Sequence, residues 1–118
     1  MRRLASAFIW AAAGIAYSLR TQPNMRVHVL AALLAVGLGW FTDISRVEWL
    51  ILILTIMAVI AAELFNTAVE AIVDLVSPDY HPLAKAAKDA AAGAVLAAAA
   101  ASLVVGVILF GPTLYRLL

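Results

Sequence analysis

The chain has 118 residues, of which 66% are hydrophobic and 13% are charged, and its formal net charge is +1. Soluble globular domains are about 45 to 50% apolar, so this composition excludes an ordinary soluble domain and indicates an integral membrane protein. The near-neutral charge argues against nucleic acid as a partner. A chain of this length has room for about three spanning helices of ~20 residues each and one interfacial segment, so we expect an all-α membrane fold.

Residues 4–20 have the pattern of an amphipathic helix that lies in the membrane interface. Apolar side chains recur there at helical spacing, at Leu4, Phe8, Ile15 and Leu19. A secretory signal peptide is the alternative, because two arginines precede a short apolar run that ends in alanines. The sequence Gln22-Pro23-Asn24 then ends the helix, since proline prefers the first turn of the next one.

The next two apolar stretches predict membrane-spanning helices over residues 25–41 and 47–76, joined by a polar turn. The second helix is ~45 Å long at 1.5 Å per residue, whereas the hydrocarbon core of a bilayer is ~30 Å thick. One of its ends must therefore project from the bilayer. With Trp49 at one interface, Glu63 lies nearer the opposite surface and Asp74 lies beyond it.

A loop with two prolines follows at residues 77–82, and a third span is predicted over residues 89–110. Gly93, Ala97 and Ala101 recur at every fourth position of this span, and small residues at that spacing let helix backbones approach closely. We therefore interpret it as a packing helix, which we expect to end at Gly111-Pro112.

The distribution of lysine and arginine predicts the topology. If the N-terminus is cytoplasmic, six basic residues lie inside and two lie outside, which agrees with the positive-inside rule. The six are Arg2, Arg3, Arg20, Arg26, Lys85 and Lys88, and the two are Arg46 and Arg116. The loop at 77–82 and the acidic end of the second span then share the cytoplasmic side.

Polar residues at spacings of three, seven and eleven mark one face of the second span. Glu63, Asn66, Glu70 and Asp74 lie within an arc of roughly 80° on a helix. Carboxylates in a spanning helix are costly in lipid, so a functional site is the first interpretation. Glu70 and Asp74, nearer water, are candidate Mg²⁺ ligands, and the deeper Glu63 is a candidate base. The alternative is a set of polar contacts between subunits that fix the register of an oligomer.

The block Glu63-Leu-Phe-Asn66-Thr67-Ala-Val-Glu70-Ala-Ile-Val-Asp74, followed by Lys88-Asp89, resembles the prokaryotic diacylglycerol kinase family. More narrowly, it resembles the undecaprenol kinase branch of that family, and the resemblance covers nearly the whole chain. It implies a single kinase domain over residues 1–118 and a homotrimer of three-span subunits in the bacterial cytoplasmic membrane. The implied activity is transfer of the ATP γ-phosphoryl group to a membrane lipid alcohol, with the active site on the cytoplasmic side.

The resemblance also implies roles for individual residues. Glu63 matches the general base that takes the proton of the lipid hydroxyl, Asn66 a positioning residue, and Glu70 the carboxylate that holds Mg²⁺ on ATP. The residues that match nucleotide contacts are Lys88 and Asp89, the loop residues Asp79, Tyr80 and His81, and Arg3 near the N-terminus.

One position departs from the family pattern. Where a second metal carboxylate is common in the family, this chain has Gln22. A neutral amide can still supply an oxygen, but it binds Mg²⁺ less strongly than a carboxylate does. A nearby acid such as Asp74 is the alternative ligand.

From these observations and the resemblance we predict a kinase that phosphorylates undecaprenol, with diacylglycerol as the alternative substrate. An alternative from another class of function is a small proton-coupled exporter, which would also use one intramembrane glutamate. That function leaves Lys88 and Asp89 without a role. A third alternative is a non-catalytic assembly subunit, which would tolerate Glu63→Gln.

Overall fold

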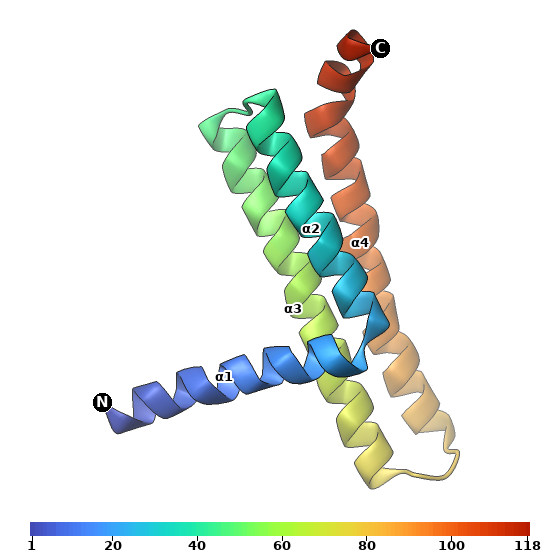
Figure 1. The fold of residues 1–118 in the computed structure, drawn as a ribbon. Coiled ribbons are helices and arrows are strands. Elements are labelled where there is room, and N and C mark those ends of the chain that lie inside the picture. Colours follow the sequence, from blue (N-terminus) through green and yellow to red (C-terminus); the bar gives the residue numbers. More distant parts are fainter.

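The computed structural model describes residues 1–118 and is all-helical. Its helices are α1 (Arg2–Thr21), α2 (Pro23–Thr42), α3 (Arg46–Val76) and α4 (Pro82–Leu117). The last three are long and apolar enough to cross a membrane. They run side by side, while α1 lies across them and meets α3 near its own C-terminal end (Figure 1). The predicted elements at 4–20, 25–41 and 47–76 agree with α1, α2 and α3 to within two residues at each end.

Local sequence explains why the α2–α3 hairpin turns where it does. Asp43 ends α2 in the left-handed region at a φ of 52°, a conformation that aspartate tolerates better than most residues. Ser45 and Glu48 then form a capping box, in which each side chain accepts a hydrogen bond from the other's backbone N–H. Beside the turn, the rings of Trp40 and Trp49 pack edge to face.

Gly39 allows the close approach of α2 and α3 beside this turn. A Cβ atom at Gly39 would lie 2.9 Å from the ring of Trp49 and 3.2 Å from Ile44. Gly39→Ala should therefore lower the free energy of unfolding by about 1 to 3 kcal/mol, as overpacking typically does. Gly37→Ala is the matched control, because a Cβ at Gly37 meets nothing within 4 Å. Thermal unfolding in detergent micelles checks the pair, and equal melting temperatures would contradict the packing role.

The third span differs from the prediction of 89–110 at both ends. α4 begins at Pro82, where proline suits the first helical position and the His81 side chain accepts a hydrogen bond from the N–H of Leu83. It continues through Gly111-Pro112 to Leu117, so the prediction that this pair ends the helix was wrong. Proline removes only one helical hydrogen bond, and a preceding glycine has no Cβ to clash with its ring.

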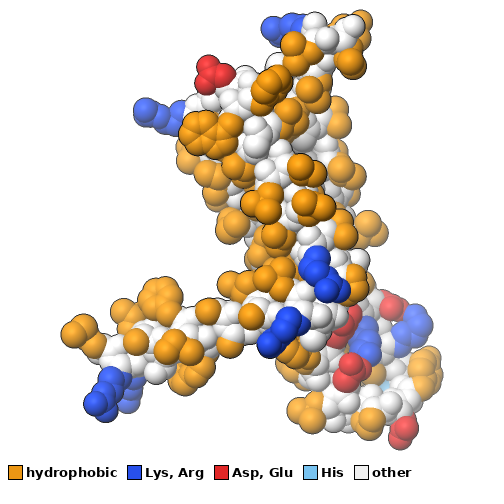
Figure 2. Space-filling model, viewed as in Figure 1, with side chains coloured by type: hydrophobic (Ala, Val, Ile, Leu, Met, Phe, Trp, Pro, Cys, Tyr) orange, Lys and Arg blue, Asp and Glu red, His pale blue; other side chains and the backbone are white.

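The bundle buries little of its own surface. Only ten of the 118 residues are buried, while large apolar side chains are exposed along every helix. Figure 2 shows hydrophobic side chains covering the middle of the bundle, and acidic and basic side chains gathered near the end that carries the α3–α4 loop. Apolar exposure on this scale is not tolerated in water. It fits a surface that contacts lipid or other subunits.

Candidate active site

The candidate active site lies where the corner between α1 and α2 meets α3. Two hydrogen bonds join the helices there. Ser18 Oγ and Thr67 Oγ1 are 2.8 Å apart and buried, and Gln22 Nε2 donates to Glu70 Oε2 at 2.8 Å. Polar pairs that find each other in an apolar surrounding fix the register of helices, because an unpaired group there is costly. The pairs hold the start of α2 against the polar face of α3.

Glu63 is the deepest acid of this face. It has no exposed surface, and neither carboxylate oxygen has a hydrogen-bond donor. His28 from α2 lies beside it, with Nε2 at 3.8 Å from Oε2. Buried polar atoms are nearly always paired, so two open acceptor atoms on one carboxylate call for a functional explanation.

Asn66 and Glu70 lie one turn and two turns further along α3. Asn66 Nδ2 donates weakly to Glu70 Oε1 at 3.4 Å, while the buried Asn66 Oδ1 has no partner. Glu70 therefore accepts from two amides, those of Gln22 and Asn66. Together, Glu63 and Asn66 present open oxygen acceptors beside a carboxylate that is held in place.

A polar hollow of about 360 Å³ lies between the end of α3 and the start of α4. It brings together six residues singled out in the sequence, Asp74, Asp79, Tyr80, His81, Lys88 and Asp89. The α3–α4 loop that forms it is held by the Ser77 hydroxyl, which donates to the carbonyl of Asp79 at 2.9 Å. The hollow is open to solvent and carries charges of both signs, which suits a polar, charged ligand.

Four charged residues of this hollow form two ion pairs. Lys88 Nζ contacts Asp74 Oδ1 at 2.5 Å, and Lys85 Nζ contacts Asp89 Oδ2 at 2.6 Å. Both pairs are exposed, and such pairs contribute little to stability. Asp74 thus bonds to Lys88 and makes no hydrogen bond with Gln22 or Glu70, and no three histidine, aspartate or glutamate side chains form a metal-binding group within the chain.

The structure places one assigned residue away from the site and brings two unassigned residues to it. Arg3 lies in the first turn of α1, at the free end of the helix and remote from α3, so one subunit does not bring it to the other site residues (Figure 1). Conversely, Ser18 and His28 were not assigned to the site from sequence, yet both contact its α3 residues.

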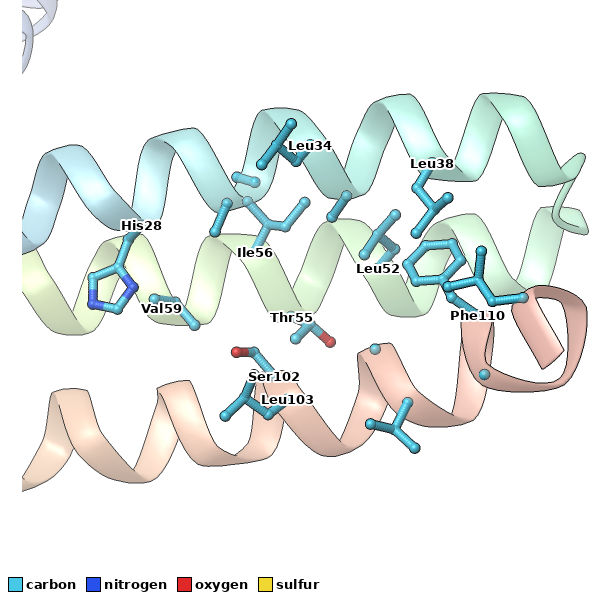
Figure 3. A pocket seen from close by; sticks show the side chains of 17 residues that line it. His28, Leu34, Leu38, Leu52, Thr55, Ile56, Val59, Ser102, Leu103 and Phe110 are labelled. Atoms are coloured by element: carbon cyan, nitrogen blue, oxygen red, sulfur yellow. The ribbon is translucent and has the colours of Figure 1, made fainter. Parts of the chain in front are cut away.

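An apolar groove of about 480 Å³ runs between α2, α3 and α4, and His28, the neighbour of Glu63, is among the residues that line it. Figure 3 shows His28 and Val59 at one end of it and Leu38 and Phe110 at the other. Thr55 and Ser102 provide the few polar atoms along its walls. Along α3, the buried Glu63 therefore lies between Val59, which lines the apolar groove, and Val73, which lines the charged hollow.

This fold and site define a class of protein: a helical membrane protein with a carboxylate site between an apolar surface and a polar, charged one. Comparison with known proteins narrows the class, since residues 9–110 match the family of prokaryotic diacylglycerol kinases. The chain belongs to the prokaryotic diacylglycerol kinase family. It is therefore an enzyme, a lipid kinase with ATP as the phosphate donor, and neither an exporter nor a non-catalytic subunit.

Individual relatives carry two different names. The chain is 42% identical to an undecaprenol kinase of Bacillus subtilis over 97% of this chain and 93% of the relative. It is 42% identical to a diacylglycerol kinase of Synechocystis over 94% of this chain and 64% of that protein. A diacylglycerol kinase of Escherichia coli K12 is 38% identical over 62% of this chain and 60% of its own length.

Proposed function

We propose that this protein phosphorylates undecaprenol to undecaprenyl phosphate with ATP. The observation that carries the proposal is the match to an undecaprenol kinase along almost the full length of both chains. The diacylglycerol kinases among its relatives match over 60 to 74% of their own lengths. Phosphorylation of diacylglycerol to phosphatidate is the alternative within the same chemistry.

In the proposed mechanism, Glu63 accepts the proton of the lipid hydroxyl while the hydroxyl oxygen attacks the γ-phosphorus of ATP. The burial of Glu63 and its lack of donors support this role, because its oxygens are free to accept. Asn66, with its own open oxygen, positions the reacting groups. The apolar groove that His28 helps to line offers the lipid chain a surface that excludes water.

The hollow at the α3–α4 loop is the proposed nucleotide site. Lys88 contacts phosphate, Asp89 supports it, and the loop residues Asp79, Tyr80 and His81 lie near the base and ribose. Lys88 and Lys85 are now paired with carboxylates at the surface, and such exposed pairs exchange for phosphate at little cost. Phosphoryl transfer requires chiefly this positioning and charge neutralisation.

Glu70 and Gln22 are the proposed Mg²⁺ ligands, with Asp74 as a further oxygen donor if it leaves Lys88. Carboxylate and amide oxygens suit this hard cation, and Mg²⁺ in such sites is usually held by one or two carboxylates together with substrate phosphates. The cation would neutralise the charge of the ATP phosphates.

We further propose a homotrimer in the bacterial cytoplasmic membrane, with α1 in the cytoplasmic interface and the sites facing the cytoplasm. The extensive apolar exposure of α2, α3 and α4 supports an assembly, because one subunit leaves most of its surface uncovered. Within it, Arg3 at the free end of α1 would reach the site of a neighbouring subunit rather than its own.

The substrate experiment uses the purified protein in mixed micelles with radiolabelled ATP and equal mole fractions of undecaprenol and diacylglycerol. We expect label to enter undecaprenyl phosphate in preference to phosphatidate. Predominant labelling of phosphatidate would instead favour the diacylglycerol alternative.

Gln22→Glu should lower the Mg²⁺ concentration needed for half-maximal activity, because it supplies an anionic oxygen beside Glu70. It also replaces an amide donor with a second carboxylate, so without a cation the two charges should repel. The melting temperature should then fall below that of the parent in a chelator and rise with Mg²⁺.

Gln22→Ala is the control, because it loses the hydrogen bond without adding charge. A Gln22→Glu variant whose melting temperature and activity respond to Mg²⁺ like the parent's would place Gln22 outside the metal shell.

A further inference from the structure

The reaction releases a proton deep in the protein. Transfer of the γ-phosphoryl group forms an O–P bond to the lipid oxygen and breaks the bond to the ADP oxygen, and the hydroxyl proton passes to Glu63. The carboxylic acid must lose this proton before the next turnover. Glu63 has no exposed surface and no hydrogen-bond partner, so it has no direct contact with water through which to do so.

His28 is placed to connect Glu63 to water. Its Nε2 lies 3.8 Å from Glu63 Oε2, and its side chain is 19% exposed whereas that of Glu63 is 1% exposed. The separation is longer than a hydrogen bond, and a small side-chain movement or one bridging water closes it. Figure 3 shows the ring at one end of the groove, with the apolar Val59 as its labelled neighbour.

No other charged group competes for this position. On α3, Glu63 is the only residue in ion-pair range of His28, and Glu70 is turned to Gln22 and Asn66. Arg20 near the end of α1 and Arg26 on α2 are both exposed, and on α4 the charged residues lie near its two ends, at Lys85, Lys88, Asp89 and Arg116. His28 makes no hydrogen bond in the fold and caps no helix, so it has no evident structural duty.

We propose that His28 is the proton outlet of the site: it accepts the proton from Glu63 after phosphoryl transfer and releases it to interfacial water. This inference rests on the proposed role of Glu63 as the base. In the first step the Glu63 O–H bond breaks and an N–H bond forms at His28 Nε2, giving a carboxylate and an imidazolium. In the second step the imidazolium returns its proton to water, and both groups are restored. Histidine suits the task, because it exchanges protons readily near neutral pH.

The test is chemical rescue of His28→Ala. Its turnover number should fall by about 10²-fold or more, which begins at the low end of what positioned proton transfer contributes, while the KM for ATP stays near that of the parent. Added imidazole should restore turnover in a concentration-dependent manner. Pyrazole, a ring of the same size that hardly takes up protons at neutral pH, should not. Leu34→Ala removes another side chain of the groove on the same helix and should gain nothing from imidazole.

The possible results separate this inference from the proposed function. A turnover number of His28→Ala close to that of the parent, equal rescue by the two rings, or a loss that imidazole does not restore would each overturn the outlet role. If the alanine variant fails to fold, His28→Gln is measured instead, and a turnover near that of the parent would overturn the proposal in the same way. Normal turnover in Glu63→Gln would overturn the base assignment itself, whatever the His28 variants do.

Discussion

Replacing Glu63 with glutamine should reduce phosphoryl transfer by roughly 10²- to 10⁴-fold, the range that a positioned general base contributes. The amide has nearly the same volume but cannot take the hydroxyl proton. Because the native carboxylate is buried without a hydrogen-bond donor, losing its charge should not destabilise the fold. ATP affinity and melting temperature should therefore stay at or above those of the parent while turnover is lost.

Single-turnover transfer from radiolabelled ATP, nucleotide binding and thermal unfolding together check this result. Glu48→Gln is the matched control, since it makes the same chemical change on the same helix, at the exposed N-terminal end of α3. It should leave transfer near the parent rate. Near-normal transfer by Glu63→Gln would remove this residue from the mechanism.

Replacing Glu70 with alanine should raise the Mg²⁺ concentration needed for half-maximal activity by at least about tenfold, because loss of even an outer partner of a metal ligand costs that much. It should also weaken the fold. The alanine leaves the amides of Gln22 and Asn66 without their acceptor, and a stranded donor in a part-buried position costs about 1 to 3 kcal/mol.

Mg²⁺ titrations of activity and thermal unfolding in a chelator measure the two effects separately. Asp74→Ala is the comparison, because it removes an acid from the same helix that pairs only with Lys88 at the surface. Its melting temperature should change little. Superimposable Mg²⁺ titrations of Glu70→Ala and the parent would show that Glu70 is not a metal ligand.

The helices could be predicted well from the sequence because their causes are local. Hydropathy and periodicity located α1, α2 and α3 to within two residues, since capping groups and breakers such as Ser45 and Pro23 act on their immediate neighbours. The predicted end of the third span at Gly111-Pro112 was wrong, because proline was taken to end the helix whatever the residues around it. Hydrogen bonds on both sides of the pair outweigh the one that proline removes.

The polar face of α3 was also determined locally. A helix fixes which residues share a face, so Glu63, Asn66 and Glu70 had to point the same way. Their resemblance to a known motif then indicated the family, which the match over residues 9–110 established. The loop and α4 residues of the proposed nucleotide site follow each other closely in the chain, and they line one hollow.

What only the tertiary structure decided is which residues meet across helices. Gln22 donates to Glu70 and Ser18 pairs with Thr67, at sequence separations of 48 and 49 residues, and His28 lies beside Glu63. Periodicity fixes the rotation of each helix about its own axis, but not the height at which one helix packs against another. That height is set by many apolar contacts and a few polar pairs acting together. The sequence by itself determined a membrane kinase with an acidic face, and packing determined that a histidine stands beside its buried glutamate.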